Sequence, residues 1–78
     1  MTDDHQTPHV RGESLWRLHK EGDAASCELR ELPSSAGWEL VVRTDDEVTG
    51  TRHYDSERIA RYYADALRQD YLRDGWSE

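Results

Sequence analysis

Histidine is the residue type in this chain best suited to binding a metal, and the sequence contains four histidines. His5 and His9 are four residues apart, but Thr7-Pro8 between them disfavours the helix that would put both rings on one face. His19 and His53 are distant in the sequence, and no cysteine or carboxylate cluster completes a site at recognised ligand spacing. We therefore predict no bound metal and no cofactor.

Nucleophilic and acid–base chemistry also lack a suitable pattern. Cys27 alternates with Ala25 and Leu29 on an apolar strand face, which predicts a buried and unreactive thiol. Asp45-Asp46-Glu47 forms an acidic turn, where nothing would separate the carboxyl pKa values as acid–base catalysis requires. It also lacks the length and the glycine of a calcium loop. We expect a non-enzymatic protein with no catalytic residue.

Arginines interleaved with aromatic residues form the most suggestive pattern, as in Trp16-Arg17 and Arg52-His53-Tyr54. Single-stranded nucleic acid is often held in this way, with bases stacked on rings and phosphates bound by arginine. The competing interpretation is structural. Trp16 and Trp38 share their strand faces with leucine and valine, which predicts that both rings belong to the core.

The charge balance weighs against nucleic acid as the first choice. The formal net charge is -7, whereas nucleic-acid binding needs basic residues that displace counterions. The same charge argues against an anionic membrane surface. Nine of the ten basic residues are arginine, which suits planar recognition. Single-stranded nucleic-acid binding through sheet arginines and aromatic residues therefore stays as the alternative hypothesis.

The size of the chain favours self-association. A chain of 78 residues forms one domain with a small core, and such domains often need a disulfide, a metal or a partner subunit. Cys27 is the only cysteine, so an internal disulfide is excluded. The sequence has no secretory signal and no apolar run long enough for a membrane span. With a single thiol, this predicts a cytoplasmic protein.

The chain divides into a tail and one domain. Residues 1–12 are polar, contain Pro8 and Gly12, and show no periodicity, so we predict a disordered tail. Residues 13–78 form the predicted domain. Period-two alternation and turn residues predict four strands, over residues 13–20, 24–32, 38–44 and 48–54. Gly50 interrupts the last strand, which suggests a bulge, an edge position or the close approach of another backbone.

A helix with clear end signals follows the strands. Asp55 or Ser56 can cap its N-terminus. Gly75 can adopt the left-handed conformation at the C-terminus of the helix, so that Trp76 packs back on Tyr71 or Leu72. Helical spacing predicts one core-facing stripe, made of Ile59, Ala60, Tyr63, Ala64, Leu67 and Tyr71.

These elements predict an α+β fold of the order ββββα. The strands form an antiparallel meander, and the C-terminal helix packs on one face. This order of elements resembles that of transcriptional coactivator and plant Whirly domains, which bind single-stranded DNA as dimers or higher assemblies. The resemblance is one of topology, and no residue is carried over from it.

Several residues have no obvious place in the core of a monomer. The first group is expected on the open face of the sheet as a binding surface: Leu15, Arg17, Arg30, Val41, Arg43 and Arg52. The second group is expected on the helix as a subunit interface: Arg58, Tyr62, Gln69 and Leu72. From these we predict a small interaction domain that forms a homodimer and binds a protein partner.

Overall fold

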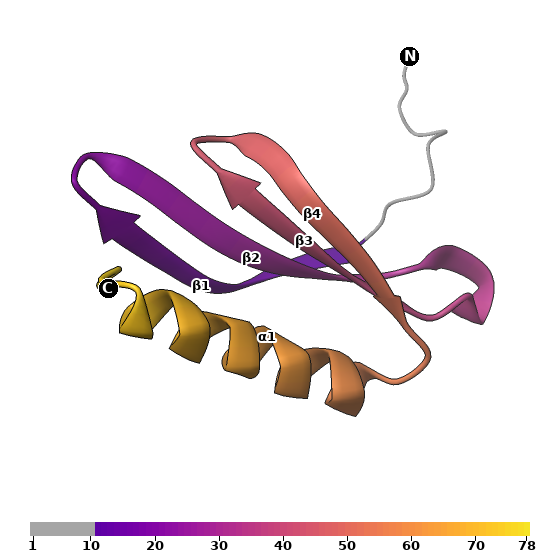
Figure 1. Cartoon of the computed structure of the whole chain (residues 1–78). Helices are drawn as coiled ribbons and strands as arrows, with labels where there is room; N and C mark the ends of the chain where they lie inside the picture. Colours follow the sequence, from indigo (N-terminus) through magenta and orange to yellow (C-terminus); the bar gives the residue numbers. More distant parts are fainter. Residues whose placement is uncertain (1–10) are drawn as a thin grey trace, which may run out of the picture.

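The computed structural model describes residues 11–78 as one antiparallel sheet with one helix packed on it (Figure 1). The strands lie in the order β1-β2-β3-β4, which confirms the predicted ββββα fold. Arg11 and Gly12 belong to β1, so the domain begins earlier than the predicted start at residue 13. The rest of the predicted tail lies outside the described residues. The elements are β1 (Arg11–Lys20), β2 (Asp23–Glu31), a short 3₁₀ helix η1 (Pro33–Ser35), β3 (Trp38–Thr44), β4 (Glu47–Tyr54) and α1 (Glu57–Arg73).

Two tight hairpins set the register of the sheet. Each has a two-residue turn in which both residues have positive φ, at Glu21-Gly22 and at Asp45-Asp46. This is the turn whose twist matches that of the adjoining strands. Asp45 is also tied to β2, because its carboxylate accepts the Ala24 N–H at 2.9 Å and its own N–H donates to the Ala24 carbonyl at 2.8 Å.

Two irregularities interrupt the pairing of the strands. One lies in β1, where Leu15 has no cross-strand partner. The other lies in β4, where Thr49 is the extra residue beside Gly50. A bulge of this kind moves every residue beyond it to the opposite face of the sheet, relative to a regular strand. Gly50 therefore marks both a bulge and an edge strand, as its position suggested.

The predicted ends of the helix are confirmed. The Ser56 hydroxyl accepts the Ile59 N–H at 3.4 Å. At the other end Gly75 has φ 100° and donates to the Leu72 carbonyl at 3.2 Å, while the Trp76 N–H donates to the Tyr71 carbonyl at 3.1 Å. These two bonds form a Schellman motif. The Trp76 and Tyr71 ring centroids lie 5.4 Å apart, which provides the hydrophobic contact of that motif.

The segment after α1 returns to the first strand. Ser77 forms an isolated antiparallel bridge with His19, through backbone bonds of 2.7 and 2.9 Å. The Lys20 ammonium donates to the Asp74 carbonyl at 2.7 Å. The C-terminal end of α1 is therefore fastened to the β1 edge, whereas β4 is the other edge of the sheet.

The core lies between the sheet and α1. Small residues at Ala60 and Ala64 let the helix approach the strands closely. The indole N–H of Trp16 is buried and donates to the Ala64 carbonyl at 2.9 Å, so its polar atom is satisfied. The buried core cluster consists of Trp16, Leu18, Ala25, Cys27, Leu29, Leu40, Ala60 and Ala64.

The connection between β2 and β3 depends on a glycine. Gly37 has φ 112°, and a Cβ added there would lie 2.7 Å from His53 Nε2 and 2.8 Å from the Tyr54 carbonyl oxygen. His53 Nε2 is itself 2.8 Å from the Ala36 carbonyl oxygen. A side chain at position 37 would therefore be strained by its backbone conformation and would also collide with β4.

Candidate interaction surfaces

The open face of the sheet carries an ion-pair network. Arg43 contacts the Glu28 carboxylate at 2.8 Å. Arg30 lies 3.4 Å from Glu28 and 4.0 Å from Glu39. Hydrogen bonding from Arg43 is the main cause that lowers the pKa of the Glu28 carboxyl, and the charge of Arg30 adds to it. Two of the predicted binding arginines are thus largely neutralised by neighbours on the same face.

Val41 belongs to this face but is not exposed. It lies opposite Glu28, its exposed fraction is 3%, and it is separate from the core cluster under the helix. Its neighbours Glu28, Glu39 and Arg43 have long side chains whose aliphatic parts can cover an apolar residue while their charged ends remain wet. The burial of Val41 therefore needs no partner, contrary to the expectation that an exposed Val41 marks a binding surface.

Leu15 is not on the open face, and this prediction was wrong. A regular β1 would have placed it opposite Glu28, but the bulge leaves it without a partner. It packs against the core cluster instead. It lines a shallow depression beside α1, together with Trp16 and Arg61.

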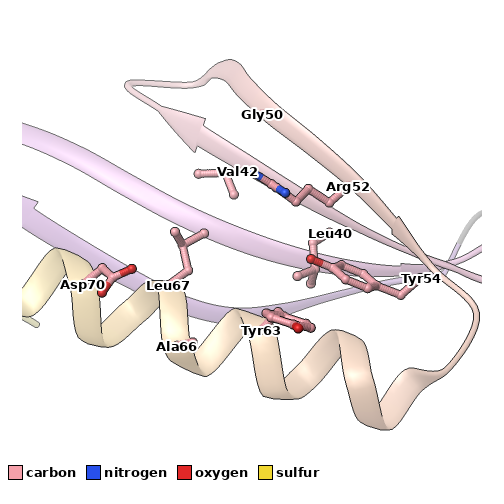
Figure 2. Close-up of a pocket in the computed structure, with 9 residues that line it drawn as sticks. All are labelled: Leu40, Val42, Gly50, Arg52, Tyr54, Tyr63, Ala66, Leu67 and Asp70. Carbon is pink, nitrogen blue, oxygen red and sulfur yellow. The ribbon is translucent and has the colours of Figure 1, made fainter.

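Arg52 is also on the other face of the sheet, so its predicted location was wrong as well. Continuing the regular hairpin from its Thr44–Glu47 pair would have set Arg52 opposite Glu39. The bulge at Thr49 shifts the register by one residue, and Arg52 pairs with Leu40. In Figure 2 its side chain extends towards Val42, and both residues line the pocket between the sheet and α1.

The sheet separates the rings from three of the four arginines named in the nucleic-acid hypothesis, and Arg52 is the exception because it lies on the helix-facing side with Tyr54 and Tyr63. Arg17 is exposed, and with Arg30 and Arg43 it occupies the open face. Every tryptophan and tyrosine lies within residues 11–78, and each is on α1, on the segment after it or on the helix-facing side of the sheet. The open face therefore lacks the stacking rings that would accompany its arginines.

A groove opens between the β3–β4 hairpin and α1, because the hairpin rises away from the helix towards its tip (Figure 1). Its volume is about 500 Å³. Tyr54 and Tyr63 stack in it with ring centroids 5.4 Å apart. The nine lining residues are labelled in Figure 2: Leu40, Val42, Gly50, Arg52, Tyr54, Tyr63, Ala66, Leu67 and Asp70.

A patch of large exposed side chains adjoins this groove on the helix. We call it the tyrosine patch, and it consists of Ile59, Tyr62 and Tyr63, which are 47%, 69% and 49% exposed. The rings of Tyr62 and Tyr63 meet edge to face at 5.2 Å. Ile59 and Tyr63 were expected in the core stripe, but both are about half exposed, so this part of the prediction was wrong.

The predicted subunit interface on the helix is only partly brought together. Arg58, Tyr62 and Gln69 are exposed on α1, and Arg58 and Tyr62 line the same depression. Leu72 does not belong with them, because it is half buried and packs against the core cluster. The segment that follows α1 turns back to β1 there, which covers that flank of the helix.

The remaining candidates for chemistry are one cysteine and the histidines. Cys27 is fully buried, and burial raises the pKa of its thiol to about 11, with a smaller effect of the Glu28 charge. His53 contacts a loop carbonyl and His19 lies in β1. Residues 11–78 contain no group of three or more histidine, cysteine or carboxylate side chains that could hold a metal ion. His5 and His9 lie outside the described residues.

Comparison of the chain with protein-family models, curated proteins and solved structures gives no match. Among residues 11–78, no helix combines the length and the hydropathy that a membrane span requires.

Proposed function

We propose that this chain is a small non-enzymatic interaction domain that binds a protein partner through the helix side of the molecule. The observation that carries the proposal is the tyrosine patch. Three large side chains with exposed fractions near or above one half lie together on α1. Tyrosine is among the residue types that contribute most to protein interfaces, because it is large, rigid and polar only at its tip.

The adjoining groove supports the same surface. Tyr63 belongs both to the tyrosine patch and to the groove wall, so the two form one continuous surface. Arg52 faces the groove and makes no ion pair with any of residues 11–78. An apolar centre with charged groups near its edge is the usual anatomy of a protein-binding surface.

The proposal includes the absence of catalysis and a cytoplasmic location. The burial of the Cys27 thiol and the pairing of Glu28 with Arg43 support the absence of catalysis. A single unpaired cysteine suits a reducing compartment.

Site-specific photo-crosslinking in the cells that express this protein tests the proposal, and it does not require that the partner be known beforehand. A benzophenone amino acid replaces Tyr62 in one variant and Val48 in the control. Val48 is a matched position, because it is also apolar and 51% exposed but lies on β4 outside the patch. We expect a discrete adduct from position 62 that Ile59→Asp removes, and none from position 48. Equal, diffuse labelling from both positions would contradict the proposal.

A further inference from the structure

Two charged side chains flank the tyrosine patch. Arg58 and Asp65 are both exposed on α1, and they are seven residues apart. Seven residues correspond to almost two helical turns, so the two side chains project from nearly the same side, about 10 Å apart along the axis. Tyr62 lies between them on this side of the helix.

Neither side chain makes an ion pair within the described chain. The arginines three and four residues from Asp65 are both engaged elsewhere. Arg61 binds Glu57 and Glu13, and Arg68 pairs with Glu78. Among residues 11–78, neither Arg58 nor Asp65 makes an ion pair.

We propose that the tyrosine patch binds a second copy of this chain, with the two α1 helices antiparallel about a two-fold axis near Tyr62. This inference rests on the proposed function and names its partner. A two-fold axis midway between Arg58 and Asp65 brings each arginine opposite the aspartate of the other copy. One rotation therefore satisfies both charges of both chains, as an interface between identical surfaces requires.

The apolar residues fit the same arrangement. With the axis near Tyr62, the two Tyr62 rings meet at the centre, and Ile59 of each copy lies opposite Ala66 of the other. Ala66 is small and exposed on α1, so it leaves room for the larger isoleucine. The spacing of Ile59, Tyr62 and Ala66 is three and then four residues, which is the repeat by which helices pack side by side.

A second copy explains this pattern better than an unrelated protein does. An unrelated partner could use any arrangement of charges, whereas a two-fold partner needs opposite charges at equal distances from one apolar centre. The helix also has a long exposed side to offer, because the core takes up only the opposite side, through Ala60 and Ala64.

Charge reversal tests the arrangement on the full chain by sedimentation equilibrium at low salt. We expect the wild-type chain to dimerise and Tyr62→Glu to abolish dimerisation, while the control Val48→Glu leaves it unchanged. Arg58→Asp and Asp65→Arg should each weaken dimerisation by about tenfold, because like charges then face each other. The double variant should recover the wild-type affinity.

Mixing the two single variants gives a sharper test. In a mixed dimer every reversed charge faces its opposite, so the equimolar mixture should form mixed dimers in preference to either homodimer. Native mass spectrometry measures this, because the two variants differ in mass, and circular dichroism verifies that each one folds. A dimer that ignores the reversals, or a double variant that does not recover, overturns the antiparallel arrangement.

The experiments distinguish the failure of the homodimer hypothesis from the failure of the proposed protein-binding function. A wild-type chain that stays monomeric at high micromolar concentration overturns the second copy as partner. If position 62 still gives a discrete adduct with a different protein, the proposed function stands with another partner. If position 62 gives no adduct at all, both fail.

Discussion

Glu28 shows how single side chains shape the open face. Its carboxylate contacts two arginines from two strands, and it lies across from the buried Val41. Arg30 and Arg43, two of the four arginines read from the sequence as a basic binding surface, are therefore paired within the protein. At this scale the sequence predicted which face Arg30 and Arg43 occupy, but not whether their charges are free, because ion pairing depends on side-chain conformations.

We expect Glu28→Gln to lower the free energy of unfolding by about 1 kcal/mol at neutral pH, since the pair is partly exposed. The pKa of Glu28 is lowered from 4.5 in the folded state. Its contribution is therefore complete above the unfolded-state pKa and is lost as the pH falls through the lowered folded-state value. Urea unfolding at neutral and strongly acidic pH measures this. A difference from wild type that persists in acid would point to packing rather than charge.

The Cys27 thiol is expected to resist alkylation in the folded protein at neutral pH. A thiol pKa of about 11 in place of 9.0 lowers the reactive thiolate fraction by about a hundredfold, and burial excludes the reagent as well. Iodoacetamide labelling followed by mass spectrometry measures the rate, with the urea-unfolded chain as reference. Comparable rates in the two states would contradict the burial of this side chain.

The strands and the helix show which local signals carry structural information. Cap residues such as Ser56 and Gly75 act through backbone geometry within one turn, so they could be read from the sequence. Bulges could not, because the extra residues Leu15 and Thr49 carry no signature of their own. Each bulge reversed the face of a predicted site residue. Gly50 was the sequence feature nearest to a bulge, but a glycine does not indicate the direction in which the register shifts.

The glycine in the connection between β2 and β3 is expected to be important for stability. Gly37→Ala should lower the free energy of unfolding by about 1–3 kcal/mol, because it forces positive φ on alanine and crowds His53 and Tyr54. Gly50→Ala is the matched control, since a Cβ there meets nothing within 4 Å. Thermal unfolding of both variants measures the difference. A Gly37→Ala chain as stable as Gly50→Ala would mean that the loop rearranges freely.

At the scale of the molecule, α1 covers the sheet unevenly. Its C-terminal end is fastened to β1 by the segment through Ser77, while the β3–β4 hairpin departs from it and leaves the groove. The fold order was predictable from periodicity and caps. The uneven cover was not, because it depends on how the hairpin departs from the helix, and it leaves Tyr63 in the wall of the groove.

Trp76→Ala tests the fastening of the helix. It removes the ring contact with Tyr71, so we expect the free energy of unfolding to fall by about 1.5–3 kcal/mol. The His19 amide should also exchange its hydrogen faster, because its acceptor is the Ser77 carbonyl. Ser77→Ala is the control, since it keeps both backbone bonds and should behave as wild type. Unchanged exchange at His19 in Trp76→Ala would show that the bridge holds without the indole.

The bridge between His19 and Ser77 has a kinetic consequence. The meander pairs each strand with its neighbour in sequence, so its contacts close short loops and can form early. The bridge closes a loop that spans nearly the whole domain, and it is expected to form after the rate-limiting step. Interactions that form so late slow unfolding without accelerating folding. The segment that follows α1 is therefore expected to lower the unfolding rate and to leave the folding rate unchanged.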